Sequence, residues 1–377
     1  MGKRELVLVV AFVVVGIVVY QFTAPPPPPG SEGFSVGGIL RNIRREMKGA
    51  RETATADSAQ TVAVPAAAVL LRVNVARVSD LTITGEDRSD IAASLHVTAR
   101  GYEKTDATAA AHAPRLKIET PGDAVVVSLE FTGMPSVSRN QPPPNLSLSL
   151  SVPKRLAVRV EPHIGRFVLT NAAGAEIMGS RGETKISRLA GDLRLTHNGG
   201  PIDVSNVRSL KLTVRNSRGT IKDVAGQTSI DGIGGDLTLS GIAGPLEIEG
   251  RNTDVTLDAA TLLKPPLRIN LTAGQLRVRG LRTEARIDGR NSDISVTLDA
   301  AAPLSIYNLG GITVTAPPAG YNVDAVATEG RVTVEDGMLT ATEGPDSHAE
   351  GKIRGGGPAL MLRATRGSIE VRKPAGK

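Results

Sequence analysis

The sequence predicts an all-β protein: a β-solenoid, built like a β-helix from stacked short strands, that follows an N-terminal transmembrane helix. Three observations support this fold class. An uncharged apolar run, LVLVVAFVVVGIVVY, occupies residues 6–20. From about residue 69, apolar and polar residues alternate as they do in strands that bury one face. From about residue 156 the strands become short, follow Gly or Asn turns, and recur at a spacing typical of a solenoid.

The composition suits a narrow, repeating core. Only 2% of the 377 residues are aromatic, so Val, Leu and Ile must fill the interior. The chain has no cysteine, which excludes disulfides, zinc–thiolate sites and a cysteine nucleophile. The net charge of +6 is spread along the chain, and no basic run is interleaved with aromatic residues. This distribution argues against nucleic acid as a partner.

The apolar run is predicted to anchor the chain in a membrane as residues 1–24. With the four residues that follow it, the run would form about 28 Å of helix at ~1.5 Å per residue, which just spans a hydrocarbon core. Tyr20 and Phe22 then lie at an interface, and Lys3 and Arg4 favour a cytoplasmic N-terminus. The side chains expected to anchor this single span are Leu6, Val10, Phe12, Val14, Ile17, Tyr20 and Phe22.

A cleaved signal peptide is the alternative to an anchor. Cleavage is disfavoured because Phe22 stands where a small residue is needed, and because Pro25 directly follows the only suitable cut. Both interpretations export the rest of the chain. We therefore expect a single-pass protein of the bacterial inner membrane or cell membrane, with most of the chain periplasmic or extracellular.

Residues 25–66 are predicted to be a Pro-rich linker and a short amphipathic stalk. PPPPPG at 25–30 extends as a polyproline spacer of roughly 15 Å at about 3.1 Å per residue. In GGILRNIRREMKGARE (37–52), four apolar residues share one helical face and four basic residues lie elsewhere on the helix. This segment either touches anionic lipid or, as we prefer, forms a short cap or stalk. Residues 49–66 are rich in Ala, Thr and Ser and are expected to be irregular.

Two β regions follow the linker. Residues 67–155 contain longer alternating strands, such as VVVSLEF (125–131) and LSLSLSV (146–152), and these are predicted to cap one end of the solenoid. Residues 156–377 form the solenoid repeat domain. No segment there offers the dozen helical residues that a parallel α/β crossover needs. A large antiparallel sandwich is the main structural alternative.

One column of aliphatic residues is predicted to run through the solenoid. Its members recur at separations of 19, 16, 18, 21, 18, 18 and 20 residues. A lone coil buries too little to offset its chain entropy, so successive coils must stack. The predicted core positions are Ile202, Ile221, Leu237, Val255, Leu276, Ile294, Ile312 and Val332.

Two segments are near copies of each other: GRNTDVTLDAA (250–260) and GRNSDISVTLDAA (289–301). They start 39 residues apart, which is two coils. Asn252 and Asn291 are expected to adopt the left-handed backbone of a turn, with the first Gly of each segment relaxing it. The second copy is longer by two residues, which lengthens the strand without moving its apolar side chains to the other face.

The chain resembles a bacterial family of exported β-strand repeat proteins that are called "putative adhesin" or a domain of unknown function. Three features carry the resemblance: LSLSLSVPKRLAVRVEPHIGRFVLTN (146–171), the run of coils with Asn and Gly turns, and the closing LRATRGSIEVRK (362–373). It covers roughly residues 70–373. It implies a β-solenoid and an adhesin-like role, and it supplies no catalytic residue.

No motif in the sequence indicates a reaction. There is no GxxxxGK[ST], HExxH or GxSxG. DGIGGDLTL (231–239) partly matches a calcium-binding coil, but it lacks the first Gly and occurs once, so a tight turn is expected instead. We predict no catalytic, cofactor-binding or metal-binding residues, and no enzyme.

Scattered polar residues are expected to be solvated. No two histidines have metal-ligand spacing, and four aspartates that repeat beside turns are interpreted as turn residues rather than as an acidic ladder. The histidines are His96, His112, His163, His197 and His348. The aspartates are Asp254, Asp258, Asp293 and Asp299.

Together these observations favour a membrane-anchored, extracytoplasmic interaction module, adhesin-like, that binds an envelope protein or a cell-wall polysaccharide. One alternative is a carbohydrate-active β-helix enzyme, which would need paired carboxylates in a groove. The other is a purely structural envelope protein.

Overall fold

The computed structural model describes residues 15–16, 19, 51–75, 78–131, 142–161, 163–258, 260–334, 339–342 and 346–374. The seven side chains predicted to anchor the chain, the Pro-rich spacer and most of the amphipathic segment lie outside these residues. Within them, no helix combines the length and the apolar character that crossing a bilayer requires.

The chain forms two compact units. The smaller contains residues 1–56, 98–113 and 133–144, and the larger contains residues 57–97, 114–132 and 145–377. The described part of the smaller unit includes a helix, α3 (Lys104–His112). The Glu103 backbone N–H donates to Asp106 at 3.3 Å in a capping box, and small alanines form the buried side of the helix.

Two segments before the solenoid differ from expectation. Residues 67–155 were expected to contain strands alone, but α3 interrupts them after β4 (Asp90–Gly101). Residues 49–66 were expected to be irregular, but β1 (Glu52–Ala63) is a strand. Most of its side chains are exposed on both faces, so the apolar alternation that marks a half-buried strand is missing from its sequence.

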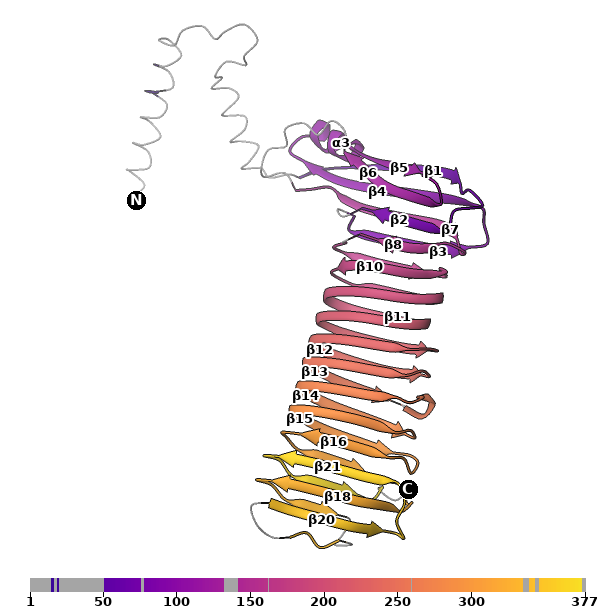
Figure 1. The fold of residues 1–377 in the computed structure, drawn as a ribbon. Helices are drawn as coiled ribbons and strands as arrows, with labels where there is room; N and C mark the ends of the chain where they lie inside the picture. Colours follow the sequence, from indigo (N-terminus) through magenta and orange to yellow (C-terminus); the bar gives the residue numbers. More distant parts are fainter. Residues whose placement is uncertain are drawn as a thin grey trace. The chain divides into compact units, whose positions relative to one another are not determined.

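The larger unit is a parallel β-solenoid, and Figure 1 shows its central strands stacked in chain order. In a full coil one strand runs along the first face, bends at a corner, and continues along the second face. Parallel pairing then joins each coil to the next. The central strands are β10 (Gly174–Ser180), β11 (Thr184–Val224), β12 (Thr228–Ile242), β13 (Leu246–Asp258), β14 (Leu267–Leu281) and β15 (Ala285–Leu298), with a short 3₁₀ helix, η1 (Ala260–Leu262), between β13 and β14.

The interior consists of aliphatic columns, one residue per coil. Leu237, Val255, Leu276, Ile294 and Ile312 are successive partners in one column. All eight predicted core residues are buried, with exposures between 0% and 3%. Along each strand the buried residues alternate with outward-facing polar ones, as one buried face requires.

Two of the eight residues are not where the predicted single column puts them. Leu237 pairs with Gly219, and Ile221 belongs to the neighbouring column, where it pairs with Leu239. Val332 does not follow Ile312 directly, because Ile369 pairs with both of them. The prediction was wrong at these two places because it sought aliphatic residues alone and assumed that coils stack in chain order.

The N-terminal end of the solenoid has a strand order that departs from chain order. The first coil, formed by β2 and β3, lies between a coil formed by β6 and β7 and one formed by β8 and β9. β5 pairs antiparallel with β6. The bounds are β2 (Leu70–Asn74), β3 (Asp80–Glu86), β5 (Pro114–Glu119), β6 (Ala124–Phe131), β7 (Asn145–Pro153), β8 (Ala157–Val160) and β9 (Arg166–Thr170).

The C-terminal end repeats this arrangement. The last coil, β21 and β22, is inserted between the coil of β16 and β17 and that of β18 and β19. β20 pairs antiparallel with β18. The bounds are β16 (Leu304–Asn308), β17 (Ile312–Thr315), β18 (Tyr321–Thr328), β19 (Val332–Val334), β20 (Asp346–Ile353), β21 (Ala359–Thr365) and β22 (Ile369–Arg372).

The corner between the two faces has a two-coil repeat. Stacked residues at this corner alternate between a hydroxyl residue and Gly, in the order Ser217, Gly235, Thr253, Gly274, Ser292 and Gly310. A Cβ on Gly235 would lie 1.9 Å from the carbonyl oxygen of Ser217, and one on Gly274 would lie 2.3 Å from that of Thr253. A coil that follows a hydroxyl corner must therefore carry Gly.

This alternation explains the repeated GRN segments. Each hydroxyl corner is preceded by an asparagine in the left-handed region, with φ of 48° at Asn216, 50° at Asn252 and 52° at Asn291. The expectation for the last two is thus confirmed. Because hydroxyl corners occur in every second coil, the segments recur after two coils, and RNS at 215–217 is a third copy.

The first Gly of each GRN segment has a different role from the one expected. Gly250 and Gly289 point inward, and neither has a positive φ. A Cβ on Gly250 would lie 2.4 Å from Leu271 Cδ2, and one on Gly289 would lie 2.5 Å from Asn308 Oδ1. They make room for larger neighbours in the adjacent coil instead of relaxing the turn.

Candidate functional site

An open groove lies on the outer surface of β14, β15, β16 and β21, which run side by side in one parallel ladder. Its volume is about 800 Å³. The lining residues are Asn270, Leu271, Thr272, Asp288, Gly289, Arg290, Tyr307, Asn308, Leu309, Arg363 and Thr365. The groove therefore crosses several coils, and a bound chain would contact more than one of them.

Tyr307 is the aromatic residue of the groove. The alternation of β16 buries Leu304 and Ile306 and turns Tyr307 outward, where it is 39% exposed. The guanidinium carbon of Arg286 lies 5.6 Å from the ring centroid, a cation–π distance. The Tyr307 hydroxyl donates to Met361 Sδ at 3.1 Å. Contacts to both neighbouring strands thus fix the orientation of the ring.

The charged residues in and beside the groove differ in whether they already bind a partner within the chain. Arg286 Nε donates to Asp288 Oδ2 at 3.0 Å, and this hydrogen bond raises the pKa of Arg286. Arg363 binds Asp324. Arg290 is exposed and has no ion-pair partner among the residues that the structure describes. Its guanidinium is therefore the cation of the groove that is free to bind a ligand.

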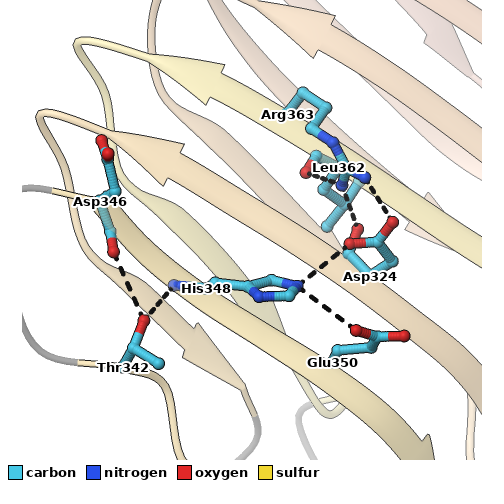
Figure 2. A network of polar contacts seen from close by, with 7 residues as sticks. All are labelled: Asp324, Thr342, Asp346, His348, Glu350, Leu362 and Arg363. Atoms are coloured by element: carbon cyan, nitrogen blue, oxygen red, sulfur yellow. Dashed lines mark hydrogen bonds and ion pairs between the residues drawn. The ribbon is translucent and has the colours of Figure 1, made fainter.

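A polar network fixes one wall of the groove (Figure 2). Arg363 donates from Nη2 to the Asp324 carboxylate and from Nη1 to the Asp324 backbone oxygen at 2.9 Å. His348 Nε2 lies 3.4 Å from Asp324 Oδ1 and 3.8 Å from Glu350 Oε2. The hydrogen bond from Arg363 is the main reason that the pKa of Asp324 is lowered. The network joins β21 to β18 and β20 and holds Arg363 in place.

The groove lies where the regular corner is interrupted. In β12 to β15 one strand runs unbroken through the corner, whereas here β16 ends at Asn308 and β17 begins at Ile312. Asn308 Nδ2 donates inward to the carbonyl oxygens of Ser292, at 2.6 Å, and Gly311, at 3.0 Å. Leu309 is left 38% exposed beside Tyr307. Departures from a regular pattern of this kind often mark functional positions.

These residue types suit the binding of an acidic sugar chain. An aromatic face carries partial negative charge and attracts the C–H bonds of a sugar ring, and a guanidinium binds a carboxylate through two hydrogen bonds. Asp288 is the one carboxylate that lines the groove. Among the described residues, no group of three or more His, Asp or Glu side chains is placed to hold a metal ion.

The other polar candidates are distributed over the solenoid. Asp254 and Asp293 are separated by Gln275, so they form no continuous acidic ladder. Asp258 pairs with Arg279 at 2.8 Å, and Asp299 lies 3.9 Å from Arg282. The suspected calcium coil is a tight corner, with positive φ at both of its adjacent glycines, Gly234 and Gly235.

Sequence reasoning did not single out Tyr307, although a signal was present. In LSIYN (304–308) the aliphatic residues alternate, which places Tyr307 on the outer face. A large aromatic residue on the outer face of a strand in a chain with four tyrosines is unusual. The groove itself had no signal, because its other wall comes from β21, more than 50 residues later.

Two histidines that were expected to be solvated are buried. His163 is 1% exposed and His197 is 0% exposed. Ser180 Oγ lies 2.8 Å from His197 Nδ1, and the His163 ring centroid lies 6.2 Å from that of Phe167. The expectation was wrong because each histidine stands at an inward position near a corner. Burial is the main cause of the lowered pKa of both rings.

We expect these buried histidines to make the solenoid less stable in mild acid. In the unfolded chain they bind protons near pH 6.5, whereas in the folded chain their pKa is lower. As the pH falls below about 6.5, unfolding takes up protons, and the free energy of unfolding should drop by about 1.4 kcal/mol per pH unit for each histidine. Denaturant unfolding between pH 8 and pH 5 measures this slope.

A His197→Gln variant should lose about half of the slope, and the double variant His163→Gln/His197→Gln should lose most of it. A free energy of unfolding that stays constant or rises as the pH falls through this window would contradict the assignment.

Three comparisons with known proteins bear on the chain. A family model described as Toastrack DUF4097 matches residues 71–372. No protein of curated function matches the sequence. Several solved structures of bacterial proteins are similar to parts of the chain.

A "putative cell adhesion protein" from Clostridium sporogenes is 11% identical, with a TM-score of 0.22, and the match covers 85% of this chain and 100% of that one. A "putative lipid binding protein" from Parabacteroides distasonis is 11% identical, with a TM-score of 0.30 and coverage of 69% and 96%. A "putative adhesin" from Parabacteroides distasonis is 11% identical, with a TM-score of 0.27 and coverage of 85% and 97%.

Proposed function

The chain belongs to the Toastrack DUF4097 family, and from that premise we propose that it is a binding module that captures an acidic polysaccharide of the cell envelope. The observation that carries the proposal is the groove around Tyr307. One face of the solenoid brings together the exposed ring of Tyr307, the exposed Leu309 and Arg290, which has no ion-pair partner among the described residues. Few precisely placed polar groups beside an apolar surface are typical of a ligand site.

The proposed place of action is the outer side of the bacterial membrane. The apolar run at residues 6–20 would anchor the chain, and the five consecutive prolines that follow would extend as a spacer. A solenoid held at a distance from the bilayer presents its outer faces to polymers of the envelope. This placement is consistent with an adhesin-like role.

Binding is favoured over hydrolysis by the chemistry of the groove. Glycoside hydrolases commonly use two carboxylates, one on either side of the scissile bond. Of the residues that line the groove, Asp288 alone carries a carboxylate, and Arg286 already binds it. Arg290 and Tyr307 can therefore hold a uronate, whereas the single carboxylate of the groove does not supply the pair that hydrolysis commonly uses.

The test is a calorimetric titration of the full chain in detergent. The probe is a β-1,4-linked mannuronate oligomer, and a cello-oligosaccharide of equal length supplies the same linkage without carboxylates. We expect the mannuronate to bind and the neutral oligomer to bind much more weakly. A Tyr307→Ala substitution should lower the affinity about tenfold, because it removes the ring on which the sugar rests.

Two further variants serve as controls. Tyr307→Phe keeps the ring and should keep most of the affinity. Ile164→Ala removes another exposed hydrophobic residue, 66% exposed, outside the groove, and should bind like the wild type. Equal binding of the two oligomers, or full affinity in Tyr307→Ala, would refute the proposal.

A further inference from the structure

Three exposed arginines stand at equivalent positions on one edge of the solenoid. Arg215, Arg251 and Arg290 each lie two residues before a hydroxyl corner, on the outer face. Between them along the stack come Ile233, which pairs with Arg215 and Arg251, and Thr272, which pairs with Arg251 and Arg290. We call the three arginines the arginine ridge.

The spacing of the ridge follows from the two-coil repeat of the corner. Parallel strands lie about 4.8 Å apart, so arginines in every second coil are about 9.6 Å apart, and the ridge is about 19 Å long. An Asn in the left-handed region follows each arginine directly, at positions 216, 252 and 291. The same corner geometry thus repeats under each guanidinium.

The ridge arginines differ from two arginines of the second face in having no anionic partner within the described chain. None of the three has an ion-pair partner among the described residues of the chain. By contrast, Arg218 binds Asp236 at 3.3 Å and Arg279 binds Asp258 at 2.8 Å. A cation without an internal partner is available to an external anion.

Acidic residues flank two of the three ridge arginines, Arg251 and Arg290, on both sides. Glu249 and Asp288 lie two residues before ridge arginines, and Asp254 and Asp293 lie three residues after them. These carboxylates repel an anion that approaches the ridge from either side, so they favour a narrow anionic chain aligned with the arginines. A broad anionic surface would meet these carboxylates, whereas a single extended chain would avoid them.

We propose that the arginine ridge binds the carboxylates of an extended 1,4-linked uronate chain, whose end lies in the groove at Tyr307. This inference rests on the function proposed above and names the feature that its ligand must have. When the linkage is β-1,4, successive sugar rings face opposite ways, so every second carboxylate lies on one side. Each sugar ring lengthens the chain by nearly one strand spacing. Carboxylates on one side of the ligand, two rings apart, therefore have nearly the same spacing as ridge arginines, which are two coils apart. Arg290 belongs to both the ridge and the groove.

The test compares a mannuronate tetramer with a dodecamer on the full chain. The tetramer fills the groove, whereas the dodecamer also reaches the ridge. We expect the wild type to bind the dodecamer at least tenfold more tightly. The double variant Arg215→Gln/Arg251→Gln should lose that gain and should keep the affinity for the tetramer, since neither residue lines the groove.

The matched control is Arg218→Gln/Arg279→Gln, which removes the same charge from the second face and should keep the full gain. An unchanged gain in the ridge variant would overturn the inference and leave the groove proposal standing. If binding tightens with chain length for polyphosphate but not for mannuronate, the choice of a uronate would be overturned. If neither oligomer binds the wild type, the proposed function itself fails.

Discussion

A chain that ends at Gly357 is expected to lose the whole C-terminal end of the solenoid, although only the last coil is removed. β21 pairs with both β16 and β18, and β22 pairs with both β17 and β19. The last coil contributes four large aliphatic side chains that are at most 1% exposed: Leu360, Leu362, Ile369 and Val371. Burying them contributes about 6–12 kcal/mol at ~1.5–3 kcal/mol each.

Hydrogen exchange of the full chain and of the shortened chain measures this effect. The amides of β18, which precede the deletion by some 30 residues, should exchange much faster in the shortened chain because they lose their parallel partner. A chain that ends at Lys373 keeps β22 and should exchange like the full chain. Undiminished protection of β18 would contradict the pairing that places β21 between β16 and β18.

The adjacent glycines Gly199 and Gly200 are expected to respond very differently to alanine. Both have positive φ, 96° and 109°. Apart from its own chain neighbours, a Cβ on Gly199 would have no atom within 4 Å, whereas one on Gly200 would lie 2.3 Å from the carbonyl oxygen of Gly182. Gly199→Ala should therefore cost only backbone strain, about 1–3 kcal/mol. Gly200→Ala must also push two coils apart and should cost more than about 4 kcal/mol.

Denaturant unfolding of the two variants beside the wild type provides the comparison. Because the sites are neighbours with similar φ, the difference between them isolates the stacking of one coil on the next. Equal costs for the two substitutions would show that backbone strain alone explains the corner glycines, and that the coils stack less closely there than the structure indicates.

Much of the solenoid could be predicted from the sequence because its physics is local. A strand that buries one face must alternate, and a coil that stacks on a copy of itself must repeat its length. Leu237, Val255, Leu276, Ile294 and Ile312 were found in this way. The left-handed turns at Asn252 and Asn291 were also predictable, since Asn tolerates that backbone.

The misplaced residues show what periodicity cannot reveal. Gly219 occupies the column that Ile221 was expected to fill, and a glycine gives no aliphatic signal. Ile369 separates Ile312 from Val332 because the chain inserts its last coil out of order. Every coil has a similar length, so the sequence period is the same whichever coil is the neighbour.

Neither the groove nor the ridge could be predicted from the sequence, because each depends on which strands lie side by side. The groove needs Arg363 beside Tyr307, and only the inserted coil brings these residues together. The ridge needs the register of β11 to β15, which shows that Arg215, Arg251 and Arg290 occupy one line. In the sequence they are three arginines among 44 Lys and Arg residues.

The most direct measurement of what the solenoid does is the footprint of a bound mannuronate dodecamer in hydrogen exchange of the full chain. We predict slower exchange in peptides that contain the groove residues 270–272, 288–290 and 307–309, with a weaker effect around the ridge residues 215 and 251. Slower exchange confined to the second face, for example at residues 236–240 and 254–258, or no change anywhere on the solenoid, would contradict binding at Tyr307.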